Sequence, residues 1–420
     1  MKQRCMGDDK MIRKLSNELK RRKEQRCHFY FQGIGNTIRK RRLELDLTQE
    51  ALAKGICSNT YISKIENNAI VANKENLYLI MERMDMPYET IVFPEEMVEI
   101  LDRSFQCFYE KNIEHYSLLM EDIQRYHLGI LVQIAKLGYY VLCGHIPEAR
   151  SIYVDMFRYL SSLEEHGLSI FIIYAIQYNI MIMDFAAARK IIQMTQNTFF
   201  QGDSILAMYH FSQYVVDGFQ YRFSHARMHH DVAQLILNAH HNTLRLKELM
   251  SYYNMFLLFE GNIHEVDVNL DICASLNPIQ KNLYLLMFLS SGVETYPKLF
   301  DPNQNAPLYP DCLVFLGLRA MKESHADRLK DIQDQIDAFQ AIHPTTIDYK
   351  RWLDVSRDPQ KGSFKDFIVQ KVLPFYECHQ LFFVYHVMTQ EAVTSFRASK
   401  RYKDALVYQE KCMTFLEHMQ

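Results

Sequence analysis

The sequence predicts an all-α protein in which a small N-terminal bundle of short helices precedes a long array of paired helices. Its 420 residues include only 14 Gly and 11 Pro, against 21 Met, 26 Tyr and 26 Phe. So few chain-breaking residues among so many large apolar ones favour long helices over a turn-rich β architecture. From about residue 97 onwards, apolar residues recur at helical spacing to the end of the chain.

These patterns separate four segments of the chain. Residues 1–33 are polar and basic, and we expect a mobile arm with at most a marginal helix over Met11 to Arg26. The bundle carries four or five short helical patterns, which Pro87 and Pro94 close. The predicted segments are a basic N-terminal extension (1–33), the bundle (34–88), a linker (89–96) and the helical array (97–420).

A spacing recurs within the array. Pairs of helical patterns are joined by tight turns, and the second helix of a pair opens with a small or slim residue at Ala149, Ala188, Ala226 and Val266, intervals of 39, 38 and 40 residues. Ala405 repeats the pattern near the C-terminus. Two helices cross closely where one carries a small side chain, so this spacing is typical of an αα-solenoid. A long all-α core without regular repeats is the alternative.

Charge is distributed unevenly along the chain. Residues 1–90 hold 18 Lys and Arg against 12 Asp and Glu, a net of +6, whereas the remainder holds 29 against 38, a net of −9. A basic N-terminal part on an acidic body indicates that only the first part meets a polyanion.

The cysteine spacing and the hydropathy of the sequence indicate the cellular compartment in which the protein works. The nine cysteines are scattered without a CxxC pair, and no secretory signal sequence precedes them, so we expect reduced thiols in a cytoplasmic protein. The most membrane-like stretch runs from Leu168 to Met183, but Gln177 and Asn179 interrupt it. We therefore predict a buried core helix there, and no membrane partner.

Residues 47–68, LTQEALAKGICSNTYISKIENN, contain two short amphipathic segments that meet at a sharp turn. Thr48 and Ser58 stand where each helix would be capped, and Gly55 permits the turn between them. Ile62 and Ile65 point inward, at the spacing of a core stripe. The outward positions of the second helix are then short polar residues and a lysine, which can reach base edges in a major groove without steric bulk.

Residues 34–86 resemble the helix-turn-helix domain of phage-repressor-like regulators, the XRE family. The spacing I-G-x-x-I-R-x-x-R-x-x-x-x-L-T-Q-x-x-L-A runs from Ile34 to Ala53, and ISKIENN stands where the family shows an I-S-x-I-E-x-G ending. Asn68 replaces the glycine, and Asn tolerates the left-handed backbone needed there. The resemblance implies an internal ion pair between Arg42 and Glu66, in keeping with the inward face that Arg42 shares with Ile38.

The same resemblance implies which residues contact double-stranded DNA. Gln49 and Asn67 match positions that contact backbone phosphates. Asn59, Thr60 and Lys64 match positions that face the bases, with Ser63 beside them. The full predicted set of DNA-binding residues is Arg39, Gln49, Ser58, Asn59, Thr60, Ser63, Lys64 and Asn67. Alternatively, such a unit serves as a protein-interaction module that touches no DNA.

A helix-turn-helix unit followed by a linker and helical repeats resembles the RRNPP group of peptide-responsive regulators, and Tyr140-x3-Gly144-x4-Ala149 locally resembles a tetratricopeptide repeat. The resemblance implies a homodimeric transcriptional regulator whose repeat groove binds a short signalling peptide. Amide side chains can satisfy the backbone of an extended peptide. The predicted peptide-binding residues are Gln177, Asn179, Glu248, Ser251, Asn254 and Met255, with ordinary burial as the equal alternative for each.

Other functions are less well supported by the residues. No Gly-rich phosphate loop, nucleophile elbow or dense acid–base cluster is present, so we expect neither an enzyme nor a cofactor. His225 and His229 have metal-like spacing, but no Cys lies near them, and we expect no metal site. Two alternatives to the peptide-controlled regulator stay open: a repeat scaffold that recruits a protein partner, and a peptide-independent dimeric repressor.

Overall fold

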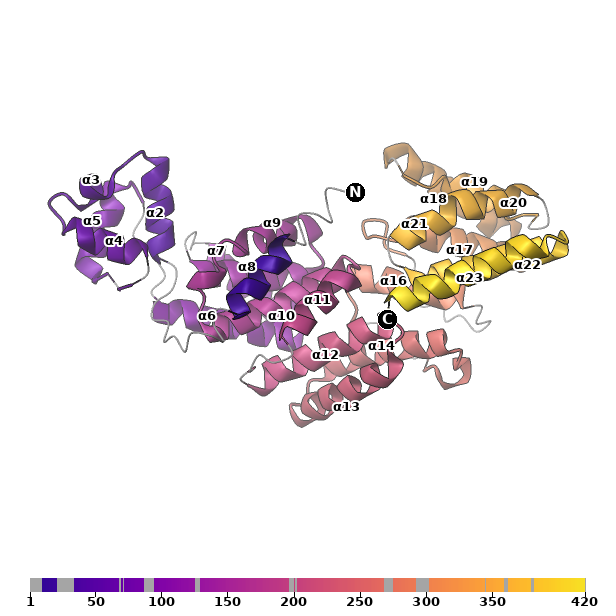
Figure 1. Cartoon of the computed structure of the whole chain (residues 1–420), viewed down its shortest axis with the longest axis horizontal. Coiled ribbons are helices and arrows are strands. Elements are labelled where there is room, and N and C mark those ends of the chain that lie inside the picture. The colour runs from indigo at the N-terminus through magenta and orange to yellow at the C-terminus, as the bar shows by residue number, and fades with distance from the viewer. Residues whose placement is uncertain are drawn as a thin grey trace. The chain divides into compact units, whose positions relative to one another are not determined.

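The computed structural model describes residues 10–20, 34–67, 69–70, 72–86, 94–124, 129–195, 200, 202–267, 275–291, 302–343, 345–358, 362–378 and 381–419. Over these ranges every regular element is helical and no strand occurs, which confirms the predicted fold class (Figure 1). The chain forms two compact units, Met1–Asn179 with Ala187–Ser212, and Ile180–Ala186 with Gln213–Gln420.

After a helix at residues 10–20, the first unit contains four short helices, α2 (Ile34–Glu44), α3 (Gln49–Ala53), α4 (Asn59–Glu66) and α5 (Lys74–Arg83). It continues through α6 (Pro94–Glu110), α7 (Ile113–Gln124), α8 (Ile130–Cys143), α9 (Ile146–Met156) and the 3₁₀ turn Leu160–Ser162. Within this unit, α8 packs against α6, α7 and α9. Three further helices carry the chain between the units: α10 (Glu165–Met181), α11 (Phe185–Thr195) and α12 (Asp203–Phe219).

The second unit continues with α13 (Phe223–Ala239), α14 (Thr243–Glu260), the 3₁₀ turn Ile263–Glu265, α16 (Pro278–Ser290), α17 (Tyr309–Lys322) and α18 (Ala326–Ile342). Then follow α19 (Tyr349–Val355), α20 (Gly362–Phe367), a π-helical stretch Ile368–Val372, α21 (Leu373–Cys378), α22 (Phe382–Ala398) and α23 (Tyr402–Met419). Here α13 packs against α14, α17 against α18, and α22 against α23, so the unit is built from antiparallel helical hairpins.

One backbone feature joins the helices of several hairpins: a single residue in the left-handed conformation. Gly144, Met183, Tyr221 and Gly261 adopt it with φ of 79°, 59°, 59° and 78°. They are separated by 39, 38 and 40 residues, the same intervals that the small residues show. Lys400 does the same before α23, with φ of 59°. The repeat thus exists as a recurring turn, whichever residue type occupies it.

Four of the five small or slim residues predicted near the start of a second helix are buried in the structure. Ala149, Ala188, Ala226 and Ala405 each lie five residues after a left-handed turn residue and are at most 2% exposed. Val266 differs, because it follows the 3₁₀ turn that ends α14's hairpin and is only half-buried. The predicted helix start at Val266 is therefore wrong.

The N-terminal extension also differs from the mobile arm that its composition predicts. Residues 10–20 form a helix in which Ile12, Leu15 and Leu19 are at most 6% exposed. Their i, i+3, i+7 spacing gives the helix one apolar face, and Arg13, Lys14 and Lys20 lie on the exposed remainder. The prediction of a mobile arm rested on the many basic residues and overlooked this apolar stripe. The rest of the marginal helix predicted to Arg26 lies outside the described residues.

The membrane-like stretch lies in α10, where Leu168 and every residue from Ser169 to Met181 are buried. A helix that is apolar all round belongs to a protein core, so the predicted core helix is confirmed. In the part of the chain that the structure describes, no helix is both long and apolar enough to cross a membrane.

The approach of α12 to α14 depends on a glycine. A Cβ atom added to Gly218 would overlap the ring of Phe256, which is 4% exposed and has little room to move. Phe256 also stacks edge-on against Tyr214 and Phe219, with ring centroids 5.2 Å apart in both pairs. The contact therefore holds an aromatic cluster of α12 against α14.

We expect Gly218→Ala to destabilise the second unit by about 1–3 kcal/mol, since a well-packed core must shift to accept the extra methyl group. Gly362→Ala is the matched control, because nothing lies within 4 Å of its Cβ position. Hydrogen exchange of α12 and α14 in the full chain measures the local loss. Similar protection of these helices in the two variants would contradict the close contact.

Candidate nucleic-acid interface

Helices α2 to α5 share a small apolar core of their own. Its buried members are at most 3% exposed, and half-buried Ile56, Cys57 and Tyr61 pack at its edge. The core consists of Ile38, Leu52, Ala53, Ile62, Ile65, Leu77, Ile80, Met81 and Met84. All four helices contribute to this core, and the residues from α4 and α5 recur at helical spacing. The core therefore fixes the orientation of α3 and α4.

The predicted caps of α3 and α4 are confirmed. The Thr48 Oγ1 accepts a hydrogen bond of 3.0 Å from the Ala51 amide, and the Ser58 Oγ accepts one of 3.2 Å from the Tyr61 amide. Gly55 lies between the two helices with φ of 77°, the left-handed conformation that the sharp turn needs. Because Ser58 uses its side chain as the cap, it sets where α4 begins.

Helix α4 presents polar side chains outward. Asn59, Thr60 and Lys64 are exposed and Ser63 is half-buried, whereas Ile62 and Ile65 on the opposite face are at most 2% exposed. Asn67 forms the exposed C-cap. On α2, Arg39 is also exposed. The fold therefore separates the predicted base-facing residues from the core by helical geometry alone.

A buried ion pair joins α2 to α4. The Arg42 Nε donates to the Glu66 Oε1 at 2.6 Å and its Nη2 to the Oε2 at 2.9 Å, and the residues are 8% and 2% exposed. The Arg42 Nη1 also donates to the Leu47 carbonyl at 2.7 Å. The hydrogen bond to Glu66 raises the pKa of Arg42. The geometry confirms that this pair is internal, as the family resemblance implied.

Gln49 contributes to the same pair. Its Nε2 donates to the Glu66 Oε2 at 2.8 Å, and the side chain is half-buried. The phosphate contact predicted for Gln49 would have to compete with this bond or use the amide oxygen. Gln49 thus positions α3 on the ion pair, a role that the sequence pattern did not show.

Sequence reasoning also missed two contacts of α5. The Arg83 Nη1 donates to the Leu52 carbonyl at 3.0 Å and to the Lys54 carbonyl, so it caps the C-terminal end of α3. The Tyr61 hydroxyl accepts a hydrogen bond of 3.1 Å from the Asn73 amide. These hydrogen bonds join residues far apart in sequence, so no local sequence pattern predicts them.

Gln177 and Asn179, predicted to bind peptide, lie inside the first unit. Gln177 is 7% exposed and its Nε2 donates to the Ser212 Oγ at 2.8 Å. Asn179 is 2% exposed, and its Nδ2 donates to the Tyr153 hydroxyl at 3.1 Å and to the Ala175 carbonyl at 2.7 Å. A peptide would reach these amides only if the internal bonds opened.

The four predicted peptide contacts of the second unit are buried as well. Asn254 is 1% exposed and bonds both the Asp267 backbone and the Tyr284 hydroxyl. Glu248 is 1% exposed and pairs with Arg245 at 2.5 Å, and it also accepts a bond from Gln280. Ser251 and Met255 are 0% exposed. Contact between a peptide and these residues stays a prediction, because in this structure they face the unit's interior.

The histidine-rich helix α13 shows no metal site. Among the described residues, no group of three His, Cys, Asp or Glu side chains is placed to hold a metal ion. His230 lies instead among aromatic rings, 5.1 Å from Tyr214 and 5.3 Å from Tyr253 between centroids.

Glu66→Ala would leave Arg42 buried without its partner, and we expect the bundle to lose about 3–5 kcal/mol. Glu44→Ala is the control, because it removes only the exposed Arg41–Glu44 pair of 3.4 Å and should cost less than about 1 kcal/mol. Hydrogen exchange of α2 and α4 in the full chain measures both changes. Equal protection of the two variants would show that the buried pair is not required.

Comparison with known proteins agrees with this geometry. Residues 38–91 match the helix-turn-helix family model HTH_3. Among curated proteins, no sequence matches the chain. One similar solved structure is a Rap protein complexed with Competence and Sporulation Factor, at 9% identity and a TM-score of 0.50, covering 78% of this chain and 99% of that one.

Two further solved structures are similar, each with a lower TM-score. The Bacillus thuringiensis PlcR, solved with the peptide PapR7 and DNA, has 14% identity and a TM-score of 0.31, covering 61% of this chain and 96% of that one. A PrgX mutant has 11% identity and a TM-score of 0.20, with 76% and 99% covered. The N-terminal part of this chain is therefore a helix-turn-helix domain of the XRE type, in a protein whose helical array has the fold of the Rap protein.

Proposed function

We propose that the protein is a sequence-specific DNA-binding transcriptional regulator whose activity is controlled by a short signalling peptide bound by the helical array. The observation that carries the DNA half is the exposed face of α4. Asn59, Thr60 and Lys64 stand on a helix whose opposite face is locked into a core and whose last residue is held by Arg42. A preorganised helix loses little entropy when it enters a major groove.

The chemistry of this face suits base recognition. Asn59 can donate to and accept from one base edge at once, and Lys64 can donate to guanine acceptors. Arg39 and Asn67 flank α4 with exposed polar or basic groups that suit phosphates. No Asp or Glu lies among the predicted contact positions, so a polyanion meets no repulsion there.

The effector half of the proposal is supported by the helical array. Its hairpins share the fold of a Rap protein that was solved with Competence and Sporulation Factor, and the sequence resembles the peptide-responsive RRNPP group. We further propose that the protein works in the cytoplasm as a homodimer without enzymatic activity. A dimer would place two copies of α4 on a two-fold operator, one half-site each.

We expect Asn59→Ala to weaken binding to the selected operator by about 5- to 150-fold, since one good bidentate base contact contributes about 1–3 kcal/mol of discrimination. The operator is first selected from a random duplex library with the full chain. Affinity is then measured by fluorescence anisotropy at several salt concentrations. Asn238→Ala is the control, because Asn238 is an exposed helical asparagine of α13.

Two results would contradict the DNA half. One is the absence of any enriched sequence in the selection. The other is equal operator binding by the Asn59→Ala and Asn238→Ala proteins, which would favour the scaffold alternative. Loss of non-specific binding in both variants would instead indicate misfolding, which the hydrogen exchange of α2 and α4 detects.

We expect a peptide of about five to ten residues from a synthetic library to change operator affinity by about 5- to 150-fold, the usual range of coupling between two sites. The same anisotropy assay measures the change, with a sequence-scrambled peptide as control. Peptides that bind the chain without changing operator affinity would contradict peptide control while leaving DNA recognition intact.

A further inference from the structure

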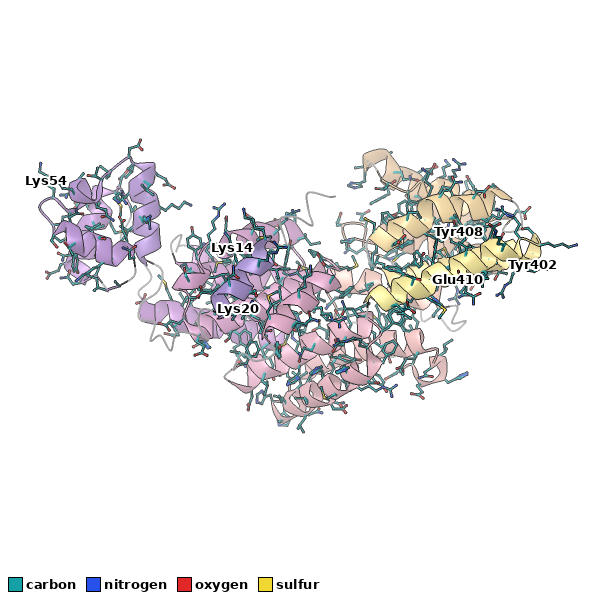
Figure 2. The ribbon with its side chains drawn as sticks, viewed as in Figure 1. Lys14, Lys20, Lys54, Tyr402, Tyr408 and Glu410 are labelled. Atoms are coloured by element: carbon teal, nitrogen blue, oxygen red, sulfur yellow. The ribbon has the colours of Figure 1, made fainter. Side chains whose placement is uncertain are left out.

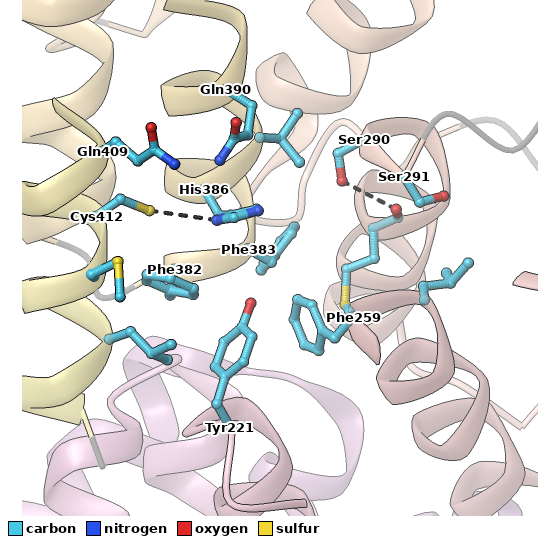
Figure 3. Close-up of a pocket in the computed structure, with 15 residues that line it drawn as sticks. Tyr221, Phe259, Ser290, Ser291, Phe382, Phe383, His386, Gln390, Gln409 and Cys412 are labelled. Carbon is cyan, nitrogen blue, oxygen red and sulfur yellow. Dashed lines mark hydrogen bonds between the residues drawn. The ribbon is translucent and has the colours of Figure 1, made fainter. Parts of the chain in front are cut away.

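The second unit contains a pocket of about 370 Å³ that none of the six predicted peptide contacts lines (Figure 3). It lies between the turn that precedes α13, the C-terminal ends of α14 and α16, and the hairpin α22–α23. Its volume falls within the range of roughly 300–1,000 Å³ typical of small-molecule sites. The hairpin α22–α23 supplies more than half of the lining residues, so a bound ligand would join it to the helices before it.

Aromatic rings form one side of the pocket. The Tyr221 ring lies 4.7 Å from that of Phe382 and 5.1 Å from that of Phe259, and Phe259 lies 5.4 Å from Phe383, all between centroids. Mixed tilted and edge-on geometry leaves both faces and edges of rings available to an incoming apolar group. This side therefore suits an aromatic or branched aliphatic group.

Tyr221 owes its position to the backbone. It is one of the left-handed turn residues, with φ of 59°, and the turn directs its ring into the pocket (Figure 3). Burial raises the pKa of Tyr221 well above its usual value, so the phenol stays neutral. Among the described residues its hydroxyl has no hydrogen-bond partner, and it is available to a ligand.

The polar side of the pocket carries hydrogen-bonding groups without charge. Burial raises the pKa of Cys412 to about 11, so the thiol is neutral at pH 7. Partial desolvation lowers the pKa of His386, an exposed residue, and this favours the neutral imidazole. The Cys412 Sγ lies 3.5 Å from the His386 Nδ1, within hydrogen-bond distance for a sulfur atom. In either tautomer the neutral His386 ring offers one N–H donor and one acceptor nitrogen. Figure 3 shows the amides of Gln390 and Gln409 beside it.

No Asp, Glu, Lys or Arg is among the described residues that line the pocket. A charged ligand group would lose its hydration there without gaining a partner of opposite charge among these lining residues. Arg397 stands behind them, where its Nη2 donates to the Gln409 Oε1 at 3.3 Å. The neutral donors and acceptors instead match an amide, which has one strong acceptor and one or two donors. The arrangement thus selects against charge and in favour of amides attached to apolar groups.

We propose that this pocket binds an uncharged ligand in which an aromatic or branched aliphatic group is joined to an amide. Two sources share this chemistry: an apolar residue within a peptide, and a free small amide. The proposal goes beyond peptide control of DNA binding, because it concerns what one site recognises and holds whichever ligand controls the operator.

The test uses the full chain and N-acetylphenylalaninamide, with N-acetylphenylalanine as the charged counterpart. Titration followed by ligand-detected NMR at pH 7 should give a dissociation constant on the order of 1 mM for the amide, as expected for a ligand of its size. The carboxylate should bind at least about tenfold more weakly, because its charge finds no partner. Equal binding of the two probes would overturn the proposal.

Two variants locate the binding. Ser291→Trp places a large ring at the half-buried pocket wall and should reduce amide binding at least tenfold, whereas Thr414→Trp on the exposed face of α23 should not. Gln390→Leu removes one amide at an exposed position and should weaken binding about threefold to tenfold, so it serves if the tryptophan variant fails to fold. Binding that survives both Ser291→Trp and Gln390→Leu would place the ligand elsewhere and overturn the proposal.

A third probe distinguishes the sources. The neutral peptide N-acetyl-Gly-Phe-Gly-amide should bind at least as well as N-acetylphenylalaninamide if the pocket accepts a residue within a chain. Loss of its binding, with the small amide retained, would support a free small amide. Both results uphold the pocket, and failure of both probes to bind would overturn it. None of these outcomes depends on operator binding, so failure of the pocket proposal can be distinguished from failure of the proposed function.

Discussion

Four hairpins of the helical array share one backbone constraint: a left-handed turn residue five positions before a small, buried residue. The turn residue reverses the chain and satisfies the carbonyl groups at the end of the first helix. The small residue lets the second helix approach the first closely, as Ala149, Ala188, Ala226 and Ala405 do. At Val266, five residues after Gly261, the chain has just left the 3₁₀ turn Ile263–Glu265, and the residue is only half-buried. A small residue is not required in every hairpin, because α17 packs against α18 although Leu329 stands five residues after the left-handed Ser324.

This constraint explains how much of the fold the sequence could predict. Gly144 and Gly261 announce their turns, and the intervals between alanines predict the period. Met183, Tyr221 and Lys400 adopt the same left-handed backbone without any local signal, because the cost of about 1–2 kcal/mol is met by packing on either side. The sequence therefore predicted the repeat period but not the left-handed turn residues that produce it. The buried stripe of residues 10–20 was concealed for another reason, since Ile12, Leu15 and Leu19 are outnumbered by charged neighbours.

In the helix-turn-helix domain, local patterns again predicted elements better than long-range bonds. Caps, core positions and the inward Arg42 follow from spacing within one or two helices. The hydrogen bond from Gln49 to Glu66 spans 17 residues, and the bond from Arg83 to Leu52 spans 31. Such bonds depend on how helices meet, which no spacing shows. They also add to what Gln49 does: the amide predicted at a phosphate donates to Glu66, in the buried pair that orients α4.

The residues of the array that were predicted to bind peptide show the same limit of sequence patterns. Amides near the middle of apolar helices, such as Gln177, Asn179 and Asn254, resemble binding residues in sequence because buried amides and peptide-binding amides sit in similar apolar surroundings. In this structure each of these amides is buried and bonded within its own unit. The pocket draws its amides from Gln390 and Gln409 instead, on the hairpin α22–α23. Gln390 is exposed and Gln409 half-buried, whereas Asn254 is 1% exposed, so exposure and not residue type separates these two groups of amides.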